Sequence, residues 1–472
     1  MHKLSDIFKN LSFWLLLFLV VFIPLYPKIP LFSVQNTFAA IRLEDLVIAF
    51  SLVVWSLYIL FSRQVKKFVT LPVNQIVGVF LLIGILSSFS GIFLTHTALP
   101  HLAVLHFLRR VELVPVLCFS IFIIQHKRQL LIVLWTLFIT SVLVNVYALG
   151  QAYLHWPVIA TTNSEFAKGQ ILYLSPGARV SSTFAGHYDL PVFLVMVMSI
   201  FIALFFYFKN TALKLLTGLG CLFCFIILVM NAARLSFAAL VVGIIILLVL
   251  LKKRMLIALL LLVVVLGAAY PSQLRDRLVS TIMVNFRSAG DTYNPKNNLQ
   301  EQRSKLNIPT LPISKDLVNA TKFSTPSGGV APDVVPGEPT DPTQLGVYRS
   351  GAIRLNYEWP LAIRAFMKNP FLGTGYSSLG LATDNDFLRS LGETGVLGSL
   401  AFFFLITRIV RDFWKGYQDK DQFTKILSAG MLIMVFCFVT NGLVIDVFEA
   451  SKIATLFWLI SGTYLGYLYQ RK

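Results

Sequence analysis

Long apolar runs separated by short polar connections are the main pattern of this sequence. A helix needs about twenty apolar residues to cross a hydrocarbon core of about 30 Å, and the runs reach or approach that length. The pattern predicts an all-α polytopic integral membrane protein with about 12 transmembrane helices. The predicted spans are roughly 12–27, 44–61, 73–94, 108–124, 129–154, 190–208, 212–231, 235–251, 254–270, 394–410, 423–445 and 450–469.

Composition points to the same class. Of the 472 residues, 56% are hydrophobic and 13% are charged, with 40 Lys or Arg and 22 Asp or Glu. A soluble chain of this length would divide into several domains, and these charges are too few to cover their surfaces. The composition also excludes a disordered protein and a fibrous repeat.

Basic residues are distributed unevenly between the two sides of the predicted bundle. Short connections on the side of the N-terminus are rich in Lys and Arg, as at 63–67, 252–254 and 408–425, whereas those on the opposite side carry few. Since positive residues concentrate in cytoplasmic loops, both termini are expected in the cytoplasm. This asymmetry accounts for much of the net charge of +18, so no nucleic-acid partner is needed.

The first apolar run follows Lys3 and Lys9 and has some features of a signal peptide. No convincing small-residue cleavage site follows it, so an uncleaved first span is the favoured interpretation. The chain is therefore expected to be a multi-pass protein that starts with a membrane span.

Two connections on the predicted outer side are long, and such loops on a helical bundle commonly carry function. One covers about 155–189. The other separates the ninth and tenth helices and divides the chain into a bundle at 1–270, a large extracytoplasmic loop at 271–393 and three helices at 394–472.

The large loop is not uniform in composition. Residues 274–286 place apolar side chains on one helix face, which predicts an amphipathic helix on the membrane surface. Residues 288–346 are rich in Pro, Gly, Ser and Thr and are predicted to form a flexible insert. Helical patterns return at 347–368 and, after a break at 369–375, at 384–393.

Charged residues at or below the outer membrane surface are costly, so each is a functional candidate by default. Arg109, Arg110 and Glu112 open the fourth span; the alternative is an interfacial cluster in which Arg109 pairs with Glu112. Arg179 and His187 lie in the first long loop, where an ordinary solvated loop is the alternative and is favoured for His187.

Further arginines follow on the same side. Arg234 occupies the tip of a very tight hairpin between two long apolar runs. Snorkelling would explain it, but a lone Arg in so short an outer turn opposes the positive-inside trend, which favours a functional role. Arg349, Arg354 and Arg364 lie in the predicted helix at 347–368, where at least one is expected on a solvated face.

Two short motifs have metal-binding or redox spacing. Asp384-Asn385-Asp386 resembles a DxD metal site, but this spacing is common by chance, and metal-assisted transfer from nucleotide sugars belongs in the cytoplasm. Cys221 and Cys224 lie within an apolar run with no nearby His, so they are interpreted as small packing residues. The sequence therefore predicts neither a metal site nor a disulfide framework.

The outer side thus offers several arginines and few carboxylates. Guanidinium groups bind phosphate oxygens through paired hydrogen bonds and keep their charge. A lipid-linked pyrophosphate at the membrane surface is the ligand that such a set of side chains predicts.

Several local patterns resemble the O-antigen ligase and polymerase family of bacterial envelope proteins, and together they cover most of the chain. Ligases of this family carry His-Asn, nine residues, Gly, two residues and Gly. Here Asp384-Asn385 precedes Gly395 and Gly398 at the same spacing, with Asp384 in place of the His. The other patterns that resemble the family are the stretch 354–375, the hairpin at Arg234 and the segment that starts at Arg179.

The resemblance implies a metal-independent glycosyltransferase, with no cofactor, in the bacterial cytoplasmic membrane. Its donor would be a glycan on undecaprenyl pyrophosphate, and its acceptor a hydroxyl of a sugar, lipid or protein, as in lipopolysaccharide or polysaccharide biosynthesis. Since the motif His is replaced, the resemblance implies a polymerase, or a ligase with another acceptor, as readily as a lipopolysaccharide ligase.

We predict that Asp384 is the catalytic base and Glu393 a weaker candidate, the alternative for Asp384 being a helix N-cap. A secondary transporter is the rival interpretation. The two halves show no matching pair of broken segments and the spans hold few acidic residues, which disfavours it. The other predicted site residues are Arg179, Arg234, Arg349 and Arg354 for the pyrophosphate, Asn385, Gly395 and Gly398 in the motif, and Arg109 and Arg110 as secondary candidates.

Overall fold

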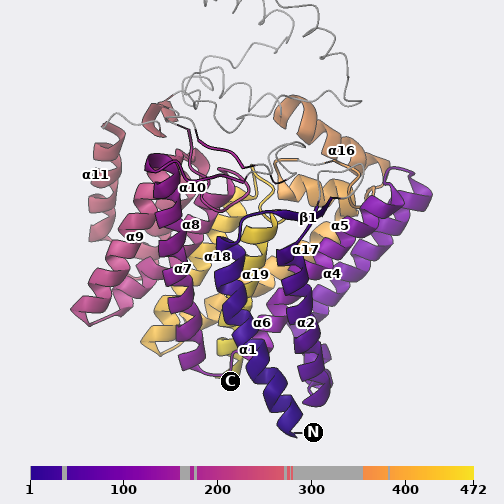
Figure 1. The fold of residues 1–472 in the computed structure, drawn as a ribbon, viewed down its shortest axis with the longest axis horizontal. Helices are drawn as coiled ribbons and strands as arrows, with labels where there is room; N and C mark the ends of the chain where they lie inside the picture. Colours follow the sequence, from indigo (N-terminus) through magenta and orange to yellow (C-terminus); the bar gives the residue numbers. More distant parts are fainter. Residues whose placement is uncertain are drawn as a thin grey trace, which may run out of the picture.

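The computed structural model describes residues 2–33, 40–159, 169, 171–174, 178–269, 274–276, 278–279, 354–380 and 383–471. The predicted insert at 288–346, Arg349 and most of the predicted amphipathic helix at 274–286 lie outside these residues. Helices account for most of the described chain (Figure 1). They are α1 (His2–Leu25), α2 (Leu43–Phe61), α3 (Val65–Thr70), α4 (Pro72–Phe89), η1 (Ser90–Leu94), α5 (Pro100–Leu113), α6 (Pro115–Ile123), α7 (Lys127–Tyr153), α8 (Asp189–Tyr207), α9 (Thr211–Asn231), α10 (Arg234–Leu250), α11 (Met255–Ala269), η3 (Arg354–Glu358), α16 (Trp359–Lys368), α17 (Asp386–Tyr417), α18 (Gln422–Asn441) and α19 (Ser451–Gln470).

The predicted spans fall on helical segments, although not each on a single helix, which confirms an α-helical membrane protein. By length and composition, 8 helices of the described residues can cross a membrane: α1, α2, α4 with η1, α7, α8, α9, α17 and α18. Helices α10 and α11 are apolar but shorter. The full count of twelve spans stays a prediction.

The predicted span 450–469 forms α19, and the burial of this helix explains why it carries several polar residues. All of its residues from Ser451 to Leu468 are buried, so its polar side chains face protein and not lipid. Gly462 and Gly466 allow close packing on α6, since a Cβ at either position would lie within 2.6 Å of the α6 backbone. Helix α19 therefore packs against neighbouring segments on all sides.

Three expectations about the elements need correction. A two-stranded antiparallel sheet, β1 (Pro30–Ser33) with β2 (Ala40–Arg42), joins α1 to α2, because backbone groups in this connection pair with each other. The predicted span 108–124 is divided between α5 and α6 at Pro115, which cannot donate a helical hydrogen bond. The helical stretch predicted at 384–393 and the predicted tenth span at 394–410 form one helix, α17, which begins at Asp386 and is interrupted at Gly395.

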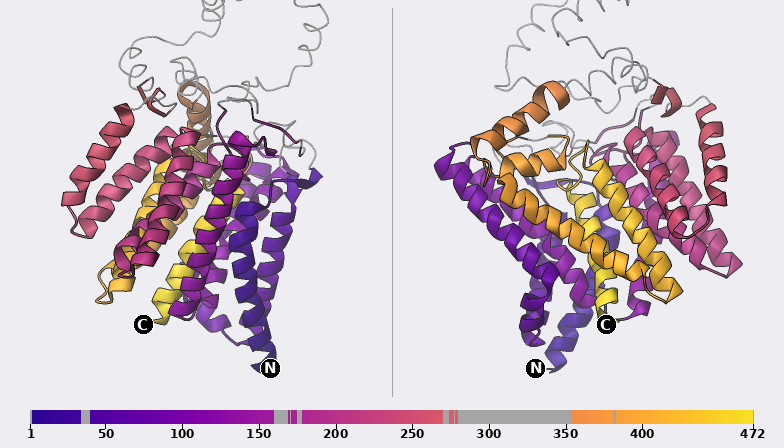
Figure 2. Two further views of the ribbon diagram at one scale, coloured as in Figure 1. Left: turned by 60° about the vertical axis from the view of Figure 1, so that its left-hand side comes forward. Right: turned by 180° about the vertical axis from the view of Figure 1, so that it is seen from behind.

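The ends of the bundle differ in content. Both termini lie at one end, whereas α16, the small sheet and the start of α17 lie at the other (Figures 1 and 2). The connections α7–α8, α9–α10 and α18–α19 also reach this second end (Figure 1). The predicted arginines that the structure describes, together with Asp384, therefore lie toward the end of the bundle opposite the termini.

Candidate functional site

A small cavity brings together three of the predicted arginines. Arg179, Arg234 and Arg354 line it, with Tyr188 and side chains of the α9–α10 and α18–α19 connections, around a volume of about 70 Å³. The three arginines come from segments that are far apart in the sequence. A cavity lined by three cationic side chains is a suitable place for a small anionic group such as a phosphate.

The hairpin that carries Arg234 is fixed at both sides. Helix α9 ends at Asn231, and Ala232 turns the chain with a left-handed φ of 55°. The Asn231 side chain donates to Val180 O at 2.7 Å, and Ser236 donates to Asn441 of α18 at 2.7 Å. Because α10 begins at Arg234, the free amide groups of the first turn of this helix lie at the end that borders the cavity.

Arg179 belongs to a segment that is packed into the bundle. Its side chain is 6% exposed and lies 5.3 Å from the centre of the Tyr188 ring. Gln151 of α7 bonds both the N–H and the carbonyl of Ser182 at 2.8 Å. His187 is buried as well. The alternative of an ordinary solvated loop is therefore wrong for Arg179 and for His187, because α7 and α9 hold this segment against the helices.

Arg354 forms an ion pair with Asp384. Its Nη2 lies 2.7 Å from Asp384 Oδ2, and both side chains are partly exposed. Burial lowers the pKa of Arg354, but Asp384, Tyr188 and Glu358 together raise it by more, so the net shift is upward and the guanidinium stays charged. A carboxylate therefore lies directly beside one of the arginines that line the cavity.

The N-cap of α17 is Asn385 and not Asp384. The Asn385 side chain accepts from the amides of Phe387 and Leu388, both at 3.0 Å. Asp384 has a left-handed φ of 49° and its carboxylate faces Arg354. The capping alternative for Asp384 is wrong, because the helix begins one residue later and the first side chain that can reach its free amides is Asn385.

The two acids of the DxD-like motif point to different partners. The Asp386 carboxylate accepts from the amides of Val447 at 2.9 Å and Phe448 at 3.2 Å, whereas Asp384 pairs with Arg354. Within the described ranges, no three His, Cys, Asp or Glu side chains are grouped so that they could hold a metal ion. The two acids of this motif therefore bind a backbone segment and an arginine. That the reaction needs no metal stays a prediction.

The motif glycines are needed for contact between two backbone segments. Gly395 interrupts α17 with φ 64°, and a Cβ there would lie 2.4 Å from Phe371 O. Across this break, Gly375 donates to Glu393 O at 2.9 Å and Val396 donates to Pro370 O at 2.8 Å. A Cβ at Gly398 would clash with the Thr394 side chain one turn earlier in the same helix. The loop after α16 thus replaces helical hydrogen bonds of α17, which only glycine allows.

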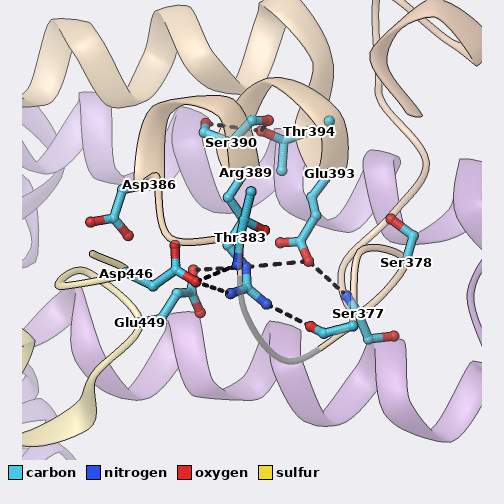
Figure 3. Close-up of polar contacts among 12 residues, drawn as sticks. Ser377, Ser378, Thr383, Asp386, Arg389, Ser390, Glu393, Thr394, Asp446 and Glu449 are labelled. Carbon is cyan, nitrogen blue, oxygen red and sulfur yellow. Dashed lines mark hydrogen bonds and ion pairs between the residues drawn. The ribbon is translucent and has the colours of Figure 1, made fainter. Parts of the chain in front are cut away.

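A second group of charged residues, which we call the buried network, lies beside this break (Figure 3). Arg389 is at its centre: Nη1 lies 2.9 Å from Asp446, and Nε lies 3.6 Å from Glu393 and 3.8 Å from Glu449. Glu393 also accepts from the amide of Ser377 at 3.2 Å. The predicted weaker base Glu393 therefore lies in the buried network and does not line the arginine cavity.

Arg110 belongs to the buried network and Arg109 does not. Arg110 forms a close ion pair with Glu449 and stacks on the Tyr376 ring at 5.3 Å. Burial raises the pKa of Tyr376 to about 12, so its hydroxyl keeps its proton at neutral pH. Arg109 lies 3.8 Å from Asp45 of α2, on a separate, mainly apolar cavity of about 430 Å³ between α2 and α5.

Sequence reasoning missed several members of the buried network. Arg389 and Glu393 have the spacing of a helical ion pair, which was a usable signal. Asp446 and Glu449 lie in the short α18–α19 connection, where nothing in the sequence relates them to Arg389. Arg364, by contrast, is exposed on α16, as predicted for at least one arginine of that stretch.

Comparison with protein families supports the resemblance. Residues 219–403 match the family model described as O-antigen ligase, a range that includes Arg234, Arg354, Asp384 and both motif glycines. No curated protein sequence matches the chain significantly. The matched residues make up less than half of the chain, and over them the chain is similar to that family. Its long apolar helices are those of a multi-pass membrane protein.

Proposed function

We propose that this chain transfers a glycan from undecaprenyl pyrophosphate to an acceptor hydroxyl at the outer face of the bacterial cytoplasmic membrane. The observation that carries this proposal is the cavity lined by Arg179, Arg234 and Arg354, with the Asp384 carboxylate 2.7 Å from Arg354. Cations for a leaving pyrophosphate and a base for an attacking hydroxyl are the two requirements of such a transfer, and both lie within one small region.

The arginines would hold the donor and stabilise its leaving group. As the bond between the anomeric carbon and the phosphate oxygen breaks, negative charge develops on the pyrophosphate, and fixed guanidinium groups offset it. Arg354 has five N–H donors, so it can bind a phosphate oxygen while it stays close to Asp384. This assignment uses the chain's own cations and requires no cofactor.

Asp384 would accept the proton of the acceptor. The acceptor oxygen forms the new bond to the anomeric carbon, and its proton moves to the Asp384 carboxylate. This carboxylate is 31% exposed, so an acceptor can reach it from outside the bundle. Asp384 would thus act from the position that the His occupies in the motif of the ligases.

The proposed orientation puts this site outside the cytoplasm. With both termini in the cytoplasm, the opposite end of the bundle, including α16, faces outward. In a chain whose four cysteines are replaced, Met367→Cys on α16, which is 69% exposed, should react with an impermeant thiol reagent in intact spheroplasts. Trp414→Cys, 45% exposed near the other end of α17, is the matched control and should react only after lysis. The reverse pattern would overturn the orientation.

The decisive experiment is transfer in vitro with purified protein, a defined undecaprenyl-pyrophosphate glycan and a panel of acceptors. A ligase adds one glycan to a distinct acceptor, whereas a polymerase of the same family, the alternative proposal, extends the glycan of a second donor repeatedly. A deletion strain separates either enzyme from a transporter. Accumulated lipid-linked glycan supports an enzyme, and unchanged glycans with altered solute uptake would support a transporter.

A further inference from the structure

The backbone around Asp384 is held by a single carboxylate from another part of the chain. Asp446, in the α18–α19 connection, accepts from the amide of Thr383 at 2.8 Å and from the amide of Asn385 at 3.1 Å. These are the two residues that flank Asp384. The carboxylate therefore bridges the chain across the residue whose own side chain faces Arg354.

Asp446 is itself fixed by Arg389 of the buried network (Figure 3). Arg389 Nη1 donates to Asp446 Oδ2 at 2.9 Å, and Nη2 donates to the carbonyl of Gly380 at 2.8 Å. The Arg389 side chain is 3% exposed and that of Asp446 is 12% exposed. Neither residue lines the arginine cavity, so neither is placed to contact a donor there.

The conformation of Asp384 needs such support. Its φ of 49° is in the left-handed region, which residues with a side chain adopt only when the surroundings impose it. The backbone two residues after Asp384 is also held by this part of the chain, since the Asp386 amide donates to Gly442 O at 2.9 Å. Hydrogen bonds on both sides of Asp384 therefore determine the direction of its carboxylate.

We propose that Asp446, held by Arg389, is a positioning residue that aims the Asp384 carboxylate at Arg354 and the acceptor. This inference rests on the proposed function, because it assigns the base through which Asp446 acts. It gives the charged α18–α19 connection, which lies outside the family match at 219–403, a defined part in the reaction.

The first test measures the backbone without reference to activity. In Asp446→Asn, hydrogen–deuterium exchange at the amides of Thr383 and Asn385 should accelerate at least tenfold relative to the unaltered chain in detergent. The matched control is Asp412→Asn, which removes another buried carboxylate of an arginine ion pair, on α17 and far from Asp384 in the sequence. The control should leave this exchange unchanged. Unchanged exchange in Asp446→Asn would overturn the proposal.

The second test asks whether Asp446 acts through Asp384. A small displacement of a reacting group costs about 10²-fold in rate, so Asp446→Asn should lower kcat about 10²-fold with the donor KM little changed. In the Asp384→Asn background, where the base is absent, the same substitution should lower the residual rate less than about threefold, because the two effects are not independent. Equal losses in both backgrounds would show a general structural effect and overturn the proposal.

A failure of the proposed function gives a different result. Full activity in Asp384→Asn alone would remove Asp384 from the reaction, and with it the catalytic purpose of its positioning. Accelerated exchange in Asp446→Asn together with non-additive rates would support both the base and its positioning residue.

Discussion

The arginine cavity and the buried network lie at the same end of the bundle but differ in charge balance. The cavity lining has three arginines and no carboxylate among its described residues, and Asp384 lies beside it. The buried network has two arginines and four carboxylates, which the protein itself supplies with partners: Arg110, Arg389, Asp386, Glu393, Asp446 and Glu449.

This difference separates binding from positioning. A buried charge must be compensated, either by the protein or by a ligand. In the network, backbone amides and ion pairs supply the compensation, so its side chains fix the loops around them. In the cavity, three guanidinium groups line an open volume, which suits an anionic ligand.

The largest expected effect is at the residue that joins the two regions. Asp384→Asn keeps the size of the side chain, and Asn also tolerates a left-handed φ. The substitution removes only the base. The transfer rate should fall about 10²- to 10⁴-fold with normal expression, and Asp384→His should recover part of it. Rates measured with the defined donor would contradict the assignment if the Asn variant matched the unaltered chain.

Substitutions in the buried network should mainly lower the stability of the fold. Arg389→Ala leaves Asp446 and Glu393 buried without their cation, which costs about 3–5 kcal/mol. The thermal unfolding midpoint in detergent should fall clearly, and so should the yield of folded protein. Arg364→Ala, on the exposed face of α16, is the control and should change stability by less than about 0.5 kcal/mol. An unchanged midpoint in Arg389→Ala would show that the network is not structural.

Substitutions of the arginines that line the cavity should mainly weaken donor binding. Arg354→Ala and Arg234→Ala each remove a charge-assisted contact worth roughly 1.5–3 kcal/mol, so kcat/KM for the donor should fall about ten- to hundredfold. Lys should rescue only partly, because it lacks the planar fork of Arg. Arg364→Ala is again the control. Full activity in both Ala variants would exclude these side chains from the donor site.

The smallest effect concerns a buried lysine outside both regions. Burial lowers the pKa of Lys28 from 10.5 to about 8, so between these values the unfolded chain binds more protons than the folded one. Stability should therefore rise as pH increases from about 8 to about 10.5, by at most about 3 kcal/mol. Thermal unfolding across this window should show a smaller rise in Lys28→Met than in the unaltered chain. If stability rose equally with pH in both proteins, the pKa of Lys28 would not be lowered in the folded state.

Much of the fold could be predicted from local pattern alone. A backbone in lipid must satisfy its own hydrogen bonds, so long apolar runs become helices whatever surrounds them. The predicted spans accordingly fall on helical segments, and the break at 369–375 was visible in its Pro and Gly residues. The sequence also indicated Arg179, Arg234, Arg354 and Asp384 as candidates, because charge near a membrane is costly wherever it occurs.

Which of these residues meet was decided only by the tertiary structure. Segments at 179, 234 and 354 converge because α8, α10 and η3 begin at the same side of the bundle, and no local pattern records that. The start of α17 at Asp386 instead of Asp384 depends on hydrogen bonds to Gly442 and Asp446, more than fifty residues away. Side-chain partners at such separations are set by helix packing, so the sequence by itself determined the helices and the candidate charges, whereas packing alone decided which charges face a cavity and which face each other.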